Sequence, residues 1–249
     1  MITKIKQKNN VYYGNNYMCG KKISEKKHLA TIELVNIPLS NMLAYLPNLS
    51  QKKCSKLEKI IKLNIPNLHI INGDSVRGES LSHKRNKSYI RCMKDYGIEQ
   101  IIDLKTSDYS DSFKHAVESN GLRYYHFPLD SDKQDVREII EYLPNLFSVI
   151  NKGNYYIACA QGLHRTDIAL ATNYLFNKNA GEQPPILYGH ITKKGIRCED
   201  IFKRTNSIFR TLTSEDRKRL GLSDYDDKLY KAKKNKLIEY NKSYINNCI

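Results

Sequence analysis

The feature that most constrains the fold is an alternation of short apolar runs with helical patterns from residue 67 onward. Four runs have the length and composition of strands: residues 68–71, 100–104, 123–127 and 155–158. Between them, three stretches are typical of helices: residues 86–96, 110–119 and 134–150. Such alternation is characteristic of parallel strands joined by crossover helices. We therefore predict an α/β fold with a central, mostly parallel sheet flanked by helices.

Local signals refine the helices of this pattern. The second helix should end at Asn120-Gly121, because glycine tolerates the left-handed conformation that closes a helix. The third should be interrupted or bent near Pro144, which has no amide donor. After Asp167, apolar residues cover a broad face of a further helix, which suits burial under the sheet.

The ends of the chain differ from this central part. Residues 1–65 are predicted to form an N-terminal extension, which begins with a polar, partly flexible stretch rich in Lys and Asn. Residues 66–180 hold the α/β core. A loop rich in Gly and Pro follows at 180–185, and residues 181–249 are predicted to be a helical, basic part that packs on the core or extends it.

A single cysteine lies where chemistry is expected. Cys159 ends the last apolar strand, five residues with a central Gly162 follow, and Arg165 opens the next helix. In such a loop the backbone amides of Ala160, Gln161, Gly162, Leu163 and His164 can surround a phosphate, and the helix dipole adds attraction for an anion. The spacing C-x5-R between a strand and a helix therefore predicts a phosphate cradle.

The residue types in the cradle fit nucleophilic chemistry. The surrounding amides and Arg165 would favour the thiolate of Cys159, which is the nucleophilic form. Arg165 carries a planar, permanently charged fork that matches two phosphate oxygens, which lysine would not reproduce. Thr166 follows directly, and its hydroxyl could donate to the sulfur when the phosphoenzyme breaks down.

The loop CAQGLHRT resembles the C-x-x-G-x-x-R-T loop of the cysteine-based protein tyrosine and dual-specificity phosphatase superfamily. The resemblance extends more weakly upstream, through GDSVRGESL, YGIEQIIDLK and GLRYYHFPLD, and does not cover residues 1–65 or about 180–249. It implies a dual-specificity-phosphatase-like fold and a phosphocysteine intermediate without metal or cofactor. Arg77, in the first of these segments, is a candidate substrate contact; the alternative is a surface arginine.

The resemblance also implies a general acid and shows two departures. The acid should be an Asp in the segment FPLDSDKQD: Asp130 is the first choice and Asp132 the alternative. Ala158 stands where the family usually has His, and Asp167 where it usually has Gly. The missing His predicts slower turnover, and an Asp167 pointing at Cys159 would oppose ionisation of the thiol.

Composition bounds the partners and the compartment. Lys and Arg outnumber Asp and Glu by 41 to 26, giving a net charge of +15, which favours anionic partners such as phosphorylated substrates, nucleic acid or acidic lipid. Abundant Lys, Asn, Ile and Tyr would equally follow from an AT-rich genome. The 6 cysteines form no CxxC pair, so neither a zinc site nor a disulfide scaffold is indicated. With no apolar leader, we expect a cytoplasmic protein, although secretion without a cleaved signal would leave no trace.

The main hypothesis is a phosphatase that hydrolyses phosphomonoesters, of the protein tyrosine or dual-specificity type. Three alternatives stay open: an RNA 5′-phosphatase, a phosphoinositide phosphatase of the same fold, or a pseudophosphatase that binds a phosphorylated partner without turnover. The loop has no lysine for extra inositol phosphates, which argues against the second. His164, a polar residue before Arg165, is reminiscent of RNA 5′-phosphatases.

Overall fold

The computed structural model describes the chain in the following parts: residues 60, 63, 65–72, 74–81, 86–106, 111–130, 134–177, 180, 183–188, 191–192, 195–196, 199–222 and 227–248. Most of the predicted N-terminal extension, residues 1–59, lies outside the described residues. Asp132, the alternative acid, does so too.

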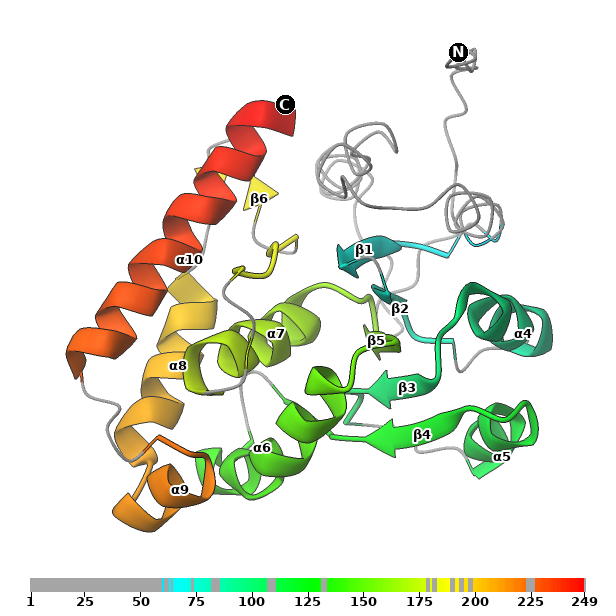
Figure 1. Cartoon of the computed structure of the whole chain (residues 1–249), viewed down its shortest axis with the longest axis horizontal. Helices are drawn as coiled ribbons and strands as arrows, with labels where there is room; N and C mark the ends of the chain where they lie inside the picture. Colours follow the sequence, from blue (N-terminus) through cyan, green and yellow to red (C-terminus); the bar gives the residue numbers. More distant parts are fainter. Residues whose placement is uncertain are drawn as a thin grey trace, which may run out of the picture.

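The centre of the fold is a five-stranded sheet with the order β1-β2-β5-β3-β4 (Figure 1). Its strands are β1 (His69–Asn72), β2 (Ser75–Glu79), β3 (Gln100–Asp103), β4 (Arg123–His126) and β5 (Tyr155–Cys159). β1 and β2 are antiparallel, whereas β2 with β5, β5 with β3, and β3 with β4 are parallel. The predicted class, α/β with a mostly parallel sheet, is confirmed.

Four helices cover the two faces of this sheet. α4 (Asn86–Tyr96) and α5 (Asp111–Ser119) lie on one side, and α6 (Val136–Asn151) and α7 (His164–Phe176) on the other (Figure 1). Neighbouring residues of a strand face opposite sides. Ile101 packs in the core under α4 and α5, and Ile102 in the core under α6 and α7. The sheet is therefore buried on both faces, as parallel sheets usually are.

The C-terminal part adds helices α8 (Glu199–Thr211), α9 (Ser214–Arg219) and α10 (Asp227–Cys248). Phe202 and Phe209 of α8, and Tyr230 and Leu237 of α10, belong to the same core as α6 and α7. A small hairpin, β6 (Ile191–Thr192) with β7 (Gly195–Ile196), precedes them and was not expected from the sequence. No helix in the described parts of the chain is long and apolar enough to cross a membrane.

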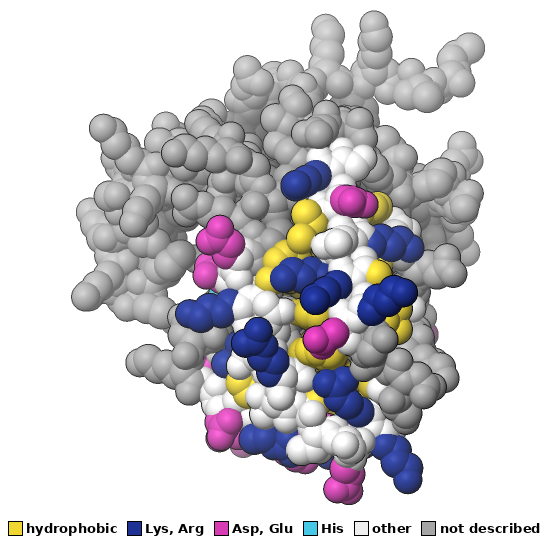
Figure 2. Space-filling view, turned by 90° about the vertical axis from the view of Figure 1, so that its left-hand side faces the viewer, with side chains coloured by type: hydrophobic (Ala, Val, Ile, Leu, Met, Phe, Trp, Pro, Cys, Tyr) yellow, Lys and Arg dark blue, Asp and Glu magenta, His cyan; other side chains and the backbone are white. Residues whose placement is uncertain are grey.

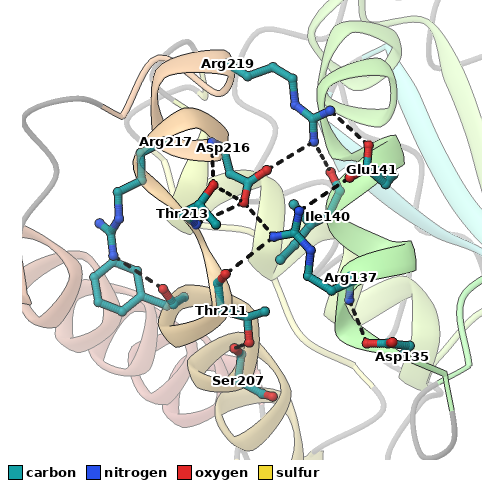
Figure 3. Close-up of polar contacts among 11 residues, drawn as sticks. Asp135, Arg137, Ile140, Glu141, Ser207, Thr211, Thr213, Asp216, Arg217 and Arg219 are labelled. Carbon is teal, nitrogen blue, oxygen red and sulfur yellow. Dashed lines mark hydrogen bonds and ion pairs between the residues drawn. The ribbon is translucent and has the colours of Figure 1, made fainter.

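Pro144 lies inside α6, close to the contacts that attach α9 to the core. Figure 3 shows these contacts between Arg137, Ile140 and Glu141 of α6 and Asp216 and Arg219 of α9. A proline cannot donate to the carbonyl four residues earlier, which here is Ile140. Arg219 of α9 takes that place: its Nη2 donates to the Ile140 oxygen at 3.1 Å, and its Nη1 to Glu141 at 3.0 Å. Asp216 of α9 also accepts from Arg137 of α6 at 2.6 Å. The carbonyl freed by the proline thus becomes a docking point for the C-terminal part.

Candidate active site

Cys159 is the last residue of β5, which lies between β2 and β3 in the sheet. Its side chain belongs to the core under α6 and α7 and is 3% exposed. Residues 160–163 form a loop, and α7 begins at His164. The strand, C-x5-R loop and helix therefore occur in the predicted order, at the carboxyl edge of the parallel strands, where open α/β sheets bind ligands.

Gly162 is required by two features of the loop. Its φ is +69°, in the left-handed region that disfavours side chains, and a Cβ there would lie 2.1 Å from the backbone carbon and oxygen of Gly78 in β2. Gly78 pairs in register with Ala158, so the loop folds back against the strand beside its own. Glycine at position 162 therefore allows the backbone of the loop to contact the backbone of β2.

Gly162→Ala is expected to destabilise the protein and to weaken phosphate binding, because backbone atoms cannot yield to the added methyl group. Gly153→Ala is the matched control: its φ is +70°, but a Cβ there would meet nothing within 4 Å. The control should cost about 1–2 kcal/mol from left-handed strain alone, and Gly162→Ala clearly more. Urea unfolding measures the loss of unfolding free energy in both variants. Equal losses would show that the close contact between Gly162 and Gly78 does not contribute to stability.

Arg77 braces the loop from β2. Its Nε and Nη2 donate to the Gly162 oxygen at 3.1 and 2.8 Å, and Nη2 also donates to the Leu163 oxygen at 2.9 Å. Nη1 donates to the Asp167 carboxylate and, at 3.3 Å, to the Ile186 oxygen. A guanidinium has five N–H donors, and these contacts use all of them.

This placement overturns both expectations for Arg77. The residue is 0% exposed, so it is not a surface arginine. The predicted substrate contact is also wrong, because every donor already has a protein acceptor. Arg77 instead holds the outer carbonyls of the loop, a geometry that leaves the opposite side of the peptide units, with their N–H groups, for an anion.

Asp167 is the acceptor of a buried ion pair. Its side chain, like that of Arg77, is 0% exposed, and the two are joined through Oδ1 and Nη1. Its negative charge is therefore neutralised by Arg77 at the start of α7. The carboxylate therefore points at the Arg77 guanidinium, a contact that the sequence did not predict.

Arg165 and Thr166 occupy the first turn of α7. Among the described residues the half-buried Arg165 guanidinium has neither a hydrogen-bond nor an ion-pair partner. Thr166 is 0% exposed, and its hydroxyl has no partner within the described parts either. The N-cap residue, Leu163, supplies no side-chain acceptor for the first amides. An unpaired cation and an uncapped helix start together favour an anion here.

The remaining loop residues differ in exposure. Ala160 is exposed, Gln161 and His164 are half-buried, and Leu163 is buried. Asn67, which the sequence did not single out, donates from Nδ2 to the Gln161 oxygen at 2.9 Å. This contact fastens the outer edge of the loop, and it joins residues 94 positions apart, so no local pattern could have revealed it.

Asp130 lies in the loop that follows β4. Because β4, β3 and β5 are parallel, this loop emerges at the same edge of the sheet as the Cys159 loop. The backbone N–H of Asp130 donates to the Gln134 side-chain oxygen at 2.9 Å. Arg204 of α8 donates to the backbone carbonyl oxygen of Asp130 at 3.1 Å. The backbone is thus fixed, and the choice of Asp130 over Asp132 as acid stays a prediction.

His69 lies next to Arg77 across the β1–β2 pair and stacks on Tyr188, with ring centroids 3.7 Å apart. Neither of its ring nitrogens has a hydrogen-bond partner among the described residues. Burial, and then the charge of Arg77, holds the pKa of His69 well below its usual 6.5. The folded protein therefore keeps this imidazole neutral.

The His69 imidazole should make the protein sensitive to acid. Below pH 6.5 the His69 imidazole binds a proton in the unfolded chain but not in the folded protein. Stability is therefore complete above 6.5 and falls by up to about 1.4 kcal/mol per pH unit below it. Urea unfolding of wild type and His69→Phe between pH 5 and 8 isolates this contribution. A difference between the two proteins that does not change with pH would contradict it.

No protein-family model and no curated protein sequence matches the chain. Among solved structures it is similar to TpbA of P. aeruginosa, at 16% identity and TM-score 0.41, covering 64% of this chain and 91% of that one. It is also similar to the catalytic core of the PP-IP phosphatase SIW14 of S. cerevisiae, at 16% identity and TM-score 0.36, covering 69% and 93%.

A third similar structure is the PTP-2 phosphatase of Cydia pomonella, at 15% identity and TM-score 0.39, covering 56% of this chain and 88% of that one. At these identities and TM-scores the similarities carry no conclusion about activity. The function must therefore be inferred from the loop itself and from the residues around it.

Proposed function

We propose that this protein is a cysteine-dependent phosphatase that hydrolyses phosphomonoesters through a phosphocysteine at Cys159. The observation that carries the proposal is the loop between β5 and α7: Arg77 binds its carbonyls from behind, while Arg165 has no partner within the described parts of the chain. A loop built in this way presents amides and one unpaired cation to a single phosphate group.

The proposed reaction has two steps, formation and hydrolysis of the phosphocysteine. The Cys159 thiolate attacks phosphorus, an S–P bond forms, and the ester P–O bond breaks while Asp130 gives its proton to the leaving oxygen. A water then attacks the phosphocysteine and yields its proton to Asp130, and the S–P bond breaks to release inorganic phosphate and the thiolate. Arg165 would bind two phosphate oxygens in both steps.

For the substrate we propose phosphorylated protein, with phosphotyrosine first. The loop interior, residues 160–164, contains no Lys or Arg for additional phosphates, which argues against highly phosphorylated inositides. Cys159 is 3% exposed, so the phosphate has to extend into the fold, and the long, flat side chain of phosphotyrosine suits this better than phosphoserine.

A substrate panel tests this proposal. Phosphotyrosine and phosphoserine peptides, a phosphoinositide and a 5′-triphosphate RNA are offered at equal concentration, and released phosphate is measured. We expect the highest kcat/KM on the phosphotyrosine peptide. Release only from the RNA or only from the inositide would move the activity to that class. Phosphate binding without release from any substrate would make the protein a pseudophosphatase.

The acid assignment gives a separate prediction. Asp130→Asn should lower kcat by about 10²-fold or more, the usual contribution of a general acid, and should flatten the basic limb of the pH profile. Asp132→Asn is the matched control and should leave the profile unchanged. Rates of para-nitrophenyl phosphate hydrolysis across the pH range distinguish the two, and the opposite ranking would transfer the role to Asp132.

A further inference from the structure

The C-terminal helix α10 is fastened to an irregular segment by one buried side chain, Asn241, which is 1% exposed. Its Oδ1 accepts from the Leu187 amide at 2.8 Å, and its Nδ2 donates to the oxygens of Pro185 and Leu237, both at 2.9 Å. Residues 184–188 have no regular secondary structure, so their buried backbone groups depend on such partners.

The same segment contacts Arg77, the residue that holds the phosphate loop. The Ile186 oxygen accepts from Arg77, and the Tyr188 ring lies 5.2 Å from the Arg77 guanidinium carbon. Tyr188 also stacks on His69, so the guanidinium is enclosed by β1 on one side and by the segment on another. Arg77 in turn holds Gly162 and Leu163.

From these contacts we infer that Asn241 is a positioning residue for the phosphate loop, acting through residues 185–188 and Arg77. The path is continuous: hydrogen bonds and one ring contact join buried or half-buried groups, and the backbone of residues 185–188 links these contacts. The role in catalysis rests on the proposed function, whereas the mechanical link from α10 to the loop does not. Residues beyond the resemblance to known phosphatases would then be part of the active site's support.

The test compares two buried residues of α10. Asn241→Ala removes the bonds to Pro185 and Leu187, whereas Leu237→Ala, one turn earlier and 0% exposed, removes only apolar packing. Hydrogen exchange of amides 160–163 and binding of orthovanadate are measured well below both midpoints of thermal unfolding. For Asn241→Ala we expect faster loop exchange and vanadate binding weakened about tenfold, the effect of one or two hydrogen bonds. Leu237→Ala should leave both near wild type.

Several outcomes would overturn the inference. It fails if Asn241→Ala lowers the unfolding midpoint but leaves loop exchange unchanged, or if Leu237→Ala alters the loop equally. If Asn241→Ala does not fold, Tyr188→Leu, which keeps the backbone bonds but removes the ring beside Arg77, should produce the same faster loop exchange; normal exchange would contradict the path. Wild type that binds no vanadate would refute the proposed function, while loop exchange would still decide the mechanical link.

A second, independent observation concerns the outer face of α8 and α10. A shallow furrow between these helices is lined by three lysines, one glutamate, one asparagine and two apolar residues: Lys203, Lys234, Lys242, Glu199, Asn206, Phe202 and Ile238. Figure 2 shows this side of the molecule, where Lys and Arg outnumber Asp and Glu around a band of apolar side chains. The furrow therefore suits an extended anionic ligand.

The furrow's geometry favours one kind of anion. Lys234 and Lys242 are eight residues apart on one helix, about 12 Å along its axis, with Lys203 facing them from α8. A membrane surface is disfavoured, because Leu229, 44% exposed, is the one exposed large hydrophobic residue among those described. We propose that the furrow binds the phosphate backbone of single-stranded RNA, as positively charged grooves commonly do.

Fluorescence anisotropy with a labelled oligouridylate of about 20 nucleotides tests this. The variant K203E/K234E/K242E is compared with R91E/K114E/K152E, which makes the same charge change on α4, on α5 and at the end of α6. If the furrow binds RNA, the first should weaken affinity far more than the second. It should also reduce the slope of the logarithm of the binding constant against the logarithm of the salt concentration by about 2, because three phosphate contacts are lost. Equal losses, or tighter binding of polyglutamate or anionic vesicles than of RNA, would overturn the proposal.

Discussion

Replacing Cys159 with Ser is expected to reduce hydrolysis of para-nitrophenyl phosphate to below about one-thousandth of the wild-type rate. A serine hydroxyl is protonated at neutral pH and attacks phosphorus poorly, whereas a thiolate is a ready nucleophile. The substitution keeps the loop, Arg165 and the helix start, so orthovanadate binding should survive. Initial rates and vanadate titrations measure the two properties separately.

Cys92 provides the matched control for this substitution. It is a free, half-buried cysteine on α4, on the other side of the sheet from the Cys159 side chain. Cys92→Ser should retain activity close to wild type. Activity that survives in Cys159→Ser would remove the cysteine from the chemistry, and activity lost equally in Cys92→Ser would assign the loss to structure.

The second large effect is expected at the Arg77–Asp167 pair. Both side chains are 0% exposed, and removing one partner leaves an uncompensated buried charge, which typically costs about 3–5 kcal/mol. Arg77→Met and Asp167→Leu should each lower the free energy of unfolding by an amount of this order. The double variant should lose clearly less than the sum, because it buries no unpaired charge.

A double-mutant cycle by urea unfolding measures this coupling. Arg77→Lys adds a test of geometry, because lysine offers three donors where the five of arginine are all used. It should retain part of the stability but weaken vanadate binding, since Gly162 and Leu163 lose partners. Additive single effects, or losses below about 1 kcal/mol, would contradict a pair that braces the loop.

Much of the fold was predictable from local pattern. The predicted helix 86–96 is α4, and the predicted strand 100–104 is close to β3. β2 was absent from the four predicted strands because SVRGE holds two charged residues and a glycine instead of an apolar run. It is a strand because β1 and β5 pair with it on both sides, which no local signal records.

The site was predictable only where its residues are close in sequence. Residues 159–166 form one continuous segment, so their spacing alone was enough to predict a phosphate cradle. Arg77 reaches Asp167 across 90 positions, and Asn241 reaches Leu187 across 54. Such contacts arise from topology, which explains why Arg77 was expected at the substrate and is found behind the loop.

The most direct test of the central claim is capture of the covalent intermediate. Wild-type protein is mixed with a phosphotyrosine peptide, quenched rapidly, digested and examined by mass spectrometry, with Cys159→Ser treated in the same way. We expect a phosphate adduct on the peptide that contains Cys159, in the wild type alone. Full activity with no adduct, or an adduct on another residue, would contradict it.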